Sequence, residues 1–283
     1  MIKFLKALCA FSKIKLFIRK CSFAKIRNSL PAPSINNVIG QRFIKLLKVD
    51  STNNYAMQQV QNGFAEHGDA YFAAEQTAGK GQFNRQWFSP KGENIILSIV
   101  LDTSTFTLDQ QFILNMIAAL SAQQLFNKYS AENSKIKWPN DIYWRDRKAA
   151  GILIENTIRG TKWQYAVVGF GININQTAFP GQLKNPVSLK QVTGKTYDVT
   201  ELARELCSIL DKEMQQLSGH KEHFILEKYN TELYKLEQII QLKKESTILS
   251  GRVKGVDRLG KLIIESNGEH VFETGAVEWL HTE

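Results

Sequence analysis

Basic side chains stand beside glycines in one polar segment of the chain, residues 76–87 (QTAGKGQFNRQW). Lys80 and Arg85 supply positive charge, and Gly79 and Gly81 let a ligand approach the backbone closely. A loop of exposed amides and cations suits a bound anion. It lacks the Gly-x4-Gly-Lys-Ser/Thr spacing of a Walker loop, and taken alone it is equally well explained as a surface loop with incidental charges.

Two more lysines occur in short motifs farther along. Lys137 opens the run KWPND, in which the Trp-Pro pair requires an extended backbone and Asn140 and Asp141 then stand at a turn. Lys148 precedes two alanines and Gly151, so little bulk surrounds it and a ligand can pack over its ammonium group. Each motif also has an explanation without function. The run KWPND can be an edge strand with a turn cap, and Lys148 can be a single exposed charge on a hairpin.

Two further motifs are polar or glycine-bearing rather than basic. The run 169–173 (GFGIN) places two glycines inside an apolar strand, where glycine usually marks the close approach of a ligand or of another backbone. The run 50–53 (DSTN) can hold a small neutral head group, and it can equally cap a helix. Each of these motifs is a weak indicator by itself.

The motifs need a frame of strands and helices, which the hydrophobic pattern supplies. Apolar, β-rich runs predict strands at 43–49, 70–74, 94–101, 136–138, 142–144, 151–156 and 163–173. Helical spacing predicts helices at 53–62, 108–129, 202–217 and 222–233. Because several strands look hairpin-linked, we expect an α+β fold: a mixed, largely antiparallel sheet with flanking helices.

The last part of the chain has a different pattern. Short strands are expected at 247–256, 262–266 and 271–272, and Asn267-Gly268 between two of them is the strongest short hairpin signal. We expect a small β-barrel here.

Composition limits the class of protein. The chain has 283 residues, 43% hydrophobic and 22% charged, which is enough apolar material for one large or two modest domains. Three scattered cysteines, Cys9, Cys21 and Cys207, do not make a disulfide scaffold or a zinc site, so we expect a reducing, cytoplasmic setting. No uncharged apolar run reaches the roughly 18 residues of a membrane span.

The net charge of +9 is concentrated at the N-terminus. Residues 1–30 contain eight basic and no acidic side chains, so the rest of the chain is close to neutral. The basic character therefore does not make a nucleic-acid-binding surface of the whole chain. We expect residues 1–36 to be a poorly ordered extension that catalysis does not need. A basic amphipathic helix and an organellar transit peptide are the alternatives, and we do not expect this tail to contact a membrane.

The order of the motifs is more specific than any one of them. Ser-Thr-Asn, the glycine-basic loop ending in Trp-Phe-Ser-Pro, Lys-Trp-Pro-Asn-Asp, Asp-Arg-Lys-x2-Gly-Ile-Leu-x-Glu and Gly-x-Gly-Ile-Asn follow one another at compatible spacings. This series resembles the biotin protein ligase family, from about residue 39 to the C-terminus. The resemblance implies a class II synthetase-like biotin/lipoate ligase catalytic domain over 37–234 and an SH3-like domain over 235–283. It resembles the form without an N-terminal DNA-binding domain, so we expect no sequence-specific DNA binding.

The resemblance also implies an activity: biotin and ATP give biotinyl-5'-AMP and pyrophosphate, and biotin then passes to one lysine of a biotin carboxyl carrier domain. Mg²⁺ would be carried by ATP, with no dedicated metal ligands, and a homodimer is left open. The implied catalytic residues are Lys148, Arg85, Lys137 and Asp141. The implied biotin-binding residues are Ser51, Thr52, Asn53, Gln76, Gly79, Lys80, Gly81, Gln82, Lys148, Gly151, Gly169 and Gly171. The implied ATP-binding residues are Arg85, Trp87, Lys137, Asn140 and Asn173.

The basic loop departs from the family's frequent Gly-Arg-Gly-Arg-x-Gly-Arg-x-Trp pattern. Lys80 stands for the first Arg and Gln82 for the second, and Asn84 stands for the inner Gly. Asn tolerates a left-handed backbone, so Asn84 can preserve the turn. Gln82 removes a cation, and we expect weaker retention of the adenylate.

Two other functions compete with this interpretation. A lipoate or octanoyl ligase resembles the same fold, but the Lys-Trp-Pro-Asn-Asp run and the glycine-basic loop argue against it. A non-catalytic biotin-binding protein is the second alternative, and the presence of Lys148, Arg85 and Lys137 argues against it.

Overall fold

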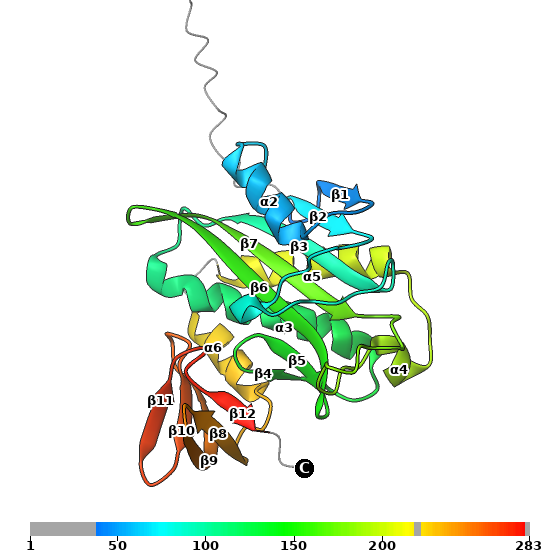
Figure 1. Ribbon diagram of the computed structural model, residues 1–283. Coiled ribbons are helices and arrows are strands. Elements are labelled where there is room, and N and C mark those ends of the chain that lie inside the picture. Colours follow the sequence, from blue (N-terminus) through cyan, green and yellow to red (C-terminus); the bar gives the residue numbers. More distant parts are fainter. Residues whose placement is uncertain (1–37, 218–221, 281–283) are drawn as a thin grey trace, which may run out of the picture. The chain divides into compact units, whose positions relative to one another are not determined.

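A computed structural model describes residues 38–217 and 222–280. The expected basic extension, residues 1–36, lies outside this range. The larger of two sheets has seven strands in the order β1-β2-β3-β7-β6-β5-β4 (Figure 1). Its strands are β1 (Phe43–Leu46), β2 (Ala70–Ala73), β3 (Asn94–Asp102), β4 (Lys135–Lys137), β5 (Asp141–Trp144), β6 (Arg147–Arg159) and β7 (Lys162–Asn173).

The pairing of these strands confirms a mixed, largely antiparallel sheet. β1 and β2 run parallel, and every other neighbouring pair is antiparallel. β6 begins at Arg147, before the predicted start at residue 151, because its first residues already pair with β5. Lys148 and Gly151 therefore lie on one strand rather than on a turn and a strand.

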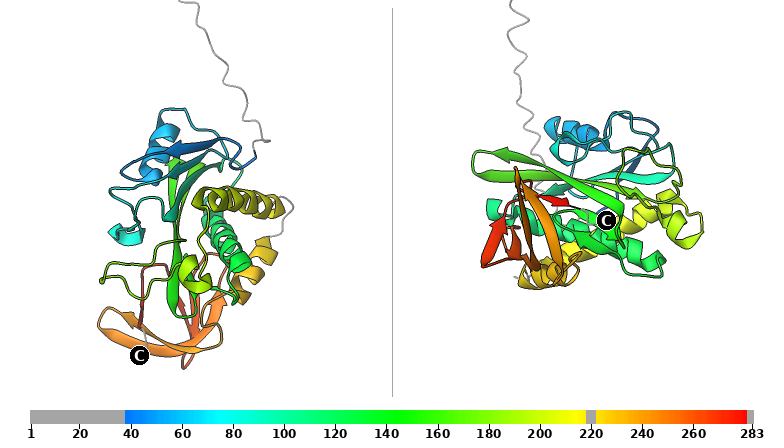
Figure 2. Two further views of the ribbon diagram at one scale, coloured as in Figure 1. Left: turned by 90° about the vertical axis from the view of Figure 1, so that its right-hand side faces the viewer. Right: turned by 60° about the horizontal axis from the view of Figure 1, so that its bottom comes forward.

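Helices cover both faces of this sheet (Figure 2). α3 (Gln111–Tyr129) and α5 (Val199–Leu217) pack on one face, and α6 (Glu222–Thr231) packs against α3. α2 (Thr52–Gln61) packs on the other face against β3 and β7. Leu97 and Ile99 of β3 belong to the core under α3 and α5, whereas Val100 belongs to the core under α2. This explains why β3 is apolar on both faces.

Two helices begin differently. At the start of α5 the Asp198 carboxylate accepts hydrogen bonds from the backbone N–H groups of Thr200 and Glu201. Ser51 occupies the N-cap position of α2, but its hydroxyl makes no capping hydrogen bond within that described helix. Three shorter elements complete the larger part: η1 (Gln82–Asn84), η2 (Leu108–Gln110) and α4 (Leu189–Thr193).

A second, five-stranded antiparallel sheet follows, in the order β11-β10-β9-β8-β12. Its strands are β8 (Ile239–Lys244), β9 (Thr247–Val256), β10 (Leu262–Glu265), β11 (Glu269–Phe272) and β12 (Glu278–Leu280). Both sheets belong to one compact unit, and the indole N–H of Trp138, just after β4, donates to the Gly260 carbonyl at 2.9 Å.

Among the described residues, no helix is both long and apolar enough to span a bilayer.

Candidate active site

A cleft of about 900 Å³ opens over the strands β5, β6 and β7 and is bordered by residues from 80 to 88 and by residues 275–279, which lead into β12. All but one of the site residues expected from the sequence line it. They are Ser51, Thr52, Asn53, Gln76, Lys80, Gly81, Gln82, Arg85, Trp87, Lys137, Asn140, Asp141, Lys148, Gly151, Gly169, Gly171 and Asn173. The exception is Gly79, whose carbonyl accepts a hydrogen bond from the Trp87 N–H at 2.9 Å and so closes the base of the loop.

One end of the cleft is a network of small polar groups at the start of α2. Gln76 Oε1 accepts from the Thr52 backbone N–H at 2.7 Å and from the Thr52 hydroxyl at 3.1 Å. The Ser98 hydroxyl lies 2.7 Å from Thr52 Oγ1 and 2.6 Å from Asn53 Oδ1. Thr52, Asn53 and Ser98 are all buried, so this end presents fixed polar atoms inside an apolar sheet, as recognition of a neutral polar head group requires.

The floor of the cleft depends on glycines in β7. A Cβ built on Gly169 would overlap the Asn53 side-chain amide, and one built on Gly171 would overlap the Trp87 indole. Neither glycine has a positive φ, so side-chain space and not backbone conformation requires glycine at both positions. The glycine motif that the sequence singled out therefore makes room for two of the predicted site residues.

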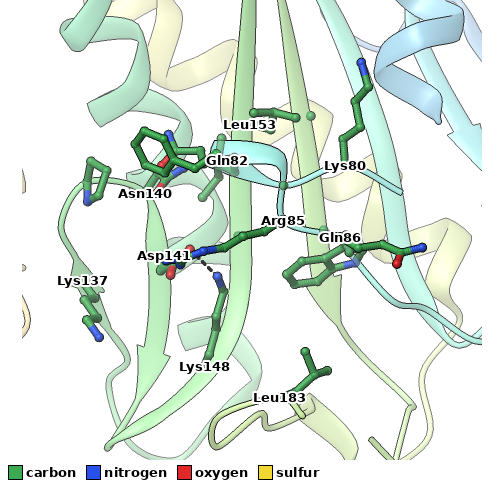
Figure 3. A pocket seen from close by; sticks show the side chains of 18 of the residues that line it. Lys80, Gln82, Arg85, Gln86, Lys137, Asn140, Asp141, Lys148, Leu153 and Leu183 are labelled. Atoms are coloured by element: carbon green, nitrogen blue, oxygen red, sulfur yellow. Dashed lines mark hydrogen bonds and ion pairs between the residues drawn. The ribbon is translucent and has the colours of Figure 1, made fainter. Parts of the chain in front are cut away.

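The other end of the cleft collects positive charge around one carboxylate. Lys148 Nζ lies 2.6 Å from Asp141 Oδ1, and Figure 3 shows Arg85 also pointing toward Asp141. The register of β5 and β6 pairs Tyr143 with Lys148 and Asp141 with Gly151, which brings the two motifs together. Lys148 and Arg85 both face the Asp141 carboxylate, so positive charge exceeds negative charge among these three side chains. Such an excess suits the binding of phosphate groups.

Lys137 belongs to the same charged end, and its ammonium group lies over two aromatic rings. Its Nζ lies 4.8 Å from the centre of the Tyr143 ring and 5.5 Å from the Trp279 indole of β12. Burial, with a smaller contribution from the nearby cations Lys148, Lys184 and Arg85, lowers the pKa of Lys137 to about 8, against the opposite effect of Asp141. An anion bound beside this lysine would favour its charged form and raise its pKa again.

Two predicted ligand-binding amides make hydrogen bonds to the backbone. Asn140 Nδ2 donates to the Ile152 carbonyl, and the Ile152 N–H donates back to the Asn140 carbonyl at 3.1 Å. Asn173 Nδ2 donates to the Val187 carbonyl at 3.1 Å and lies 3.4 Å from the Lys148 carbonyl. Both are buried, so they hold the strand that carries Lys148 in place.

Lys80 differs from what its motif suggests. Its side chain points away from the Arg85–Asp141–Lys148 group (Figure 3), and its Nζ lies 3.5 Å from Glu155 Oε1. The sequence placed Lys80 and Arg85 together as the cations of one loop, but proximity in a motif does not reveal the direction of a side chain.

Sequence reasoning also missed several residues that line the cleft or support it: Ser98, Tyr143, Glu155, Lys184 and Trp279. Glu155 is the last residue of the Lys148 motif in the sequence. Its contacts in the site are with Asn53 and Lys80, which are distant from it in the sequence. The others stand in strands or loops with no motif of their own. The described residues contain no group of three or more His, Cys, Asp or Glu side chains arranged to hold a metal ion.

Comparison with known proteins gives consistent matches. Residues 46–173 match the model of the biotin/lipoate A/B protein ligase family. The chain is 30% identical over 258 residues to the bifunctional ligase/repressor BirA of Escherichia coli K12, covering 85% of this chain and 77% of that protein. It is 29% identical over 226 residues to a biotin--[acetyl-CoA-carboxylase] ligase of Paracoccus denitrificans, covering 77% and 92%. A biotin protein ligase structure from Aquifex aeolicus superposes with a TM-score of 0.73 at 24% identity, covering 86% of this chain and all of that one.

Proposed function

The chain belongs to the biotin/lipoate A/B protein ligase family, and on that premise we propose that it is a biotin protein ligase. It joins biotin to ATP as biotinyl-5'-AMP and then passes the biotinyl group to a lysine of a biotin carboxyl carrier domain. The observation that carries this proposal is one cleft with a buried neutral polar end at Thr52 and a cationic end at Lys148.

The first step joins two anions, so charge is the main obstacle. A carboxylate oxygen of biotin attacks the α-phosphorus of ATP, the bond to the β-phosphate oxygen breaks, and pyrophosphate leaves. Lys148 faces the junction of carboxylate and α-phosphate, and Arg85 and Lys137 face the phosphates. Their fixed positions stabilise charge in the transition state without reorganising water.

The second step needs a neutral amine. The acceptor lysine attacks the carbonyl carbon of the adenylate, the carbon–oxygen bond to AMP breaks, and the amine loses a proton. A free lysine amine has a pKa near 10.4, so a base or desolvation is needed. Asp141 lines the cleft beside Lys148, and we assign to it the orientation or deprotonation of the incoming amine.

Mg²⁺ enters this proposal as the counter-ion of ATP. Among the lining residues, Glu278 offers the carboxylate oxygens that Mg²⁺ prefers, whereas Asp141 is paired with Lys148. When bound, Mg²⁺ would add positive charge at the phosphate oxygens.

A mass-shift assay tests the function. The protein is incubated with ATP, Mg²⁺, biotin and a biotin carboxyl carrier domain, and the carrier should gain the mass of one biotinyl group. A parallel reaction with lipoate, and one with both acids in competition, should show no lipoyl transfer. Modification by lipoate alone would instead support the lipoate ligase of the same fold, and binding of biotin without transfer would support a non-catalytic biotin-binding protein.

The lowered pKa of Lys137 predicts a pH dependence. Phosphates bind the ammonium form, so kcat/KM for ATP should fall as the pH rises above about 8, where the free protein loses this charge. Lys137→Arg keeps its charge throughout and should move the falling limb to higher pH. Steady-state rates from pH 6.5 to 10 at limiting ATP measure this; a limb at the same pH in both proteins would contradict the assignment.

The composition of the basic loop predicts that biotinyl-5'-AMP dissociates from this protein comparatively fast. Gln82 lines the cleft where the family often has arginine, so the loop offers one cation fewer to the adenylate phosphate. Gln82→Arg should slow the dissociation of biotinyl-5'-AMP by about tenfold, the order expected for one charge-assisted hydrogen bond. Pre-formed radioactive adenylate chased with unlabelled ligand gives the off-rates. Equal rates for the two proteins would refute the expectation, and Gln58→Arg, at an exposed position of α2 outside the cleft, serves as a control for added charge.

The proposal also covers the domain division, the cellular setting, DNA binding and the oligomeric state. We propose an SH3-like domain over 235–283 behind a catalytic domain over 37–234, and the separate five-stranded C-terminal sheet supports this division. The small cysteine count supports a cytoplasmic setting. We expect no sequence-specific DNA binding, which a binding measurement with duplex DNA tests, and sedimentation distinguishes a monomer from a homodimer.

A further inference from the structure

Glu155 of β6 makes two contacts that no motif anticipates. Its two carboxylate oxygens contact different partners: Oε2 accepts from Asn53 Nδ2 at 2.9 Å, and Oε1 lies 3.5 Å from Lys80 Nζ. The Glu155 side chain is one-third exposed, so one oxygen reaches into the protein and the other reaches the surface loop. This carboxylate therefore touches both the floor and the basic loop of the cleft.

The inner contact fixes a buried amide. Asn53 is buried, and its Nδ2 group donates to Glu155 and, at 3.3 Å, to the Leu153 carbonyl. Its Oδ1 lies 2.6 Å from the Ser98 hydroxyl, in the space that Gly169 leaves open. Both N–H groups of Asn53 thus have protein acceptors. Without Glu155 one of them would be buried without a partner, and the contacts to Ser98 and Leu153 alone would hold the amide.

The outer contact fixes the basic loop. The segment 79–87 is closed at its base by a backbone hydrogen bond between Gly79 and Trp87, and its inner turn by one from Gly81 N–H to the Arg85 carbonyl at 2.7 Å. Phe83 and Asn84 at its tip both have positive φ, a conformation that costs energy in residues other than glycine. Lys80 joins this loop to β6 through Glu155.

We propose that Glu155 is a positioning residue that ties the basic loop to the head-group end of the cleft, with one oxygen on Lys80 and the other on Asn53. The inference rests on the proposed function for its ligand, biotin, but the tether itself is a property of the free protein. Because Lys80 is held toward Glu155, the cations at the other end of the cleft act on the phosphates without it. The loop and the head-group pocket are thereby coupled.

Two substitutions separate the contacts. Glu155→Gln keeps an acceptor for Asn53 and removes the charge that holds Lys80. It should speed release of biotinyl-5'-AMP about two- to fivefold, as expected for a partly exposed ion pair, and leave KM for biotin unchanged. Glu155→Ala removes both contacts and should also raise KM for biotin by about ten- to a hundredfold, because the Asn53 donor is left buried and unpaired.

Limited trypsin digestion of the free protein tests the contact between Lys80 and Glu155 without any ligand. Cleavage after Arg85 should be two- to fivefold faster in Glu155→Gln than in the native protein. In a Lys80→Met background the same substitution should change the cleavage rate no further, because the contact is already gone. Glu205→Gln is the matched control: Glu205 of α5 also joins a lysine, Lys128, and a neutral donor, the Tyr129 hydroxyl, and it does not line the cleft.

The outcomes separate the inference from the proposed function. Native protein that forms no biotinyl-5'-AMP would refute the function, while the digestion would still decide the tether. Native activity with Glu155→Gln digested and releasing adenylate as the native protein does would overturn the tether. An equal rise in KM for biotin in Glu155→Gln and Glu155→Ala would also overturn it, because the inner contact would then depend on charge and not on an acceptor.

Discussion

Alanine in place of Lys148 should slow the formation of biotinyl-5'-AMP by about a hundred- to a thousandfold, the usual cost of removing one preorganised charge from a transition state. The Lys148 ammonium lies 2.6 Å from Asp141 and 5.8 Å from the centre of the Trp87 indole, inside the cleft. Its removal also leaves Asp141 with less positive charge nearby, so the cationic end would attract the incoming carboxylate and triphosphate less strongly. Pyrophosphate release under single-turnover conditions measures the step directly.

Controls separate lost chemistry from lost structure. Lys148→Arg keeps the charge in another shape and should recover part of the rate. Lys135→Ala removes a lysine of β4 that also forms an ion pair, with Glu232 at 3.0 Å, and does not line the cleft, so its rate should stay native. Full activity in Lys148→Ala, with thermal unfolding like that of Lys135→Ala, would refute the catalytic assignment.

Local patterns were enough to predict most of the elements that carry the site. The strand 163–173 was expected from its apolar run, and the structure has β7 at Lys162–Asn173. The same holds for β3, since β-rich residues apolar on both faces have few other places in a fold. β8 and β12 were missed, because Ile239–Lys244 alternates weakly and Glu278–Leu280 is too short to show a period.

Contacts inside the site were predictable only where the two residues lie close together in the sequence. Asp141 and Lys148 were predictable as neighbours, because a tight hairpin joins the strands that carry them. Lys80 and Glu155 are 75 residues apart, and Asn53 and Glu155 are 102 apart. No local pattern encodes such a pair, because its formation depends on how β6, α2 and the basic loop come together. The roles of single residues in the loop were therefore the least predictable part of the site.

The glycines of β7 lead to the second large expected effect. Gly169→Ala should weaken biotin binding about a hundredfold and lower the free energy of unfolding by about 1–3 kcal/mol, the usual cost of overpacking a buried site. The added Cβ would overlap the Asn53 side chain, with the Asn53 Cγ only 2.9 Å away. Asn53 would have to leave its place, and its hydrogen bonds to Glu155 and to Ser98 would be lost together.

Gly181→Ala is the matched control, because a Cβ there meets nothing within 4 Å and the residue has no positive φ. It should bind biotin normally and unfold within about 0.5 kcal/mol of the native protein. Adding Asn53→Ala to Gly169→Ala removes the overlapping group, so the double variant should regain stability relative to Gly169→Ala without regaining affinity. Calorimetric titration with biotin and thermal unfolding measure the two quantities separately. Native affinity in Gly169→Ala would mean that the head-group end tolerates a displaced Asn53, and that the network of Asn53, Ser98 and Glu155 does not position the ligand.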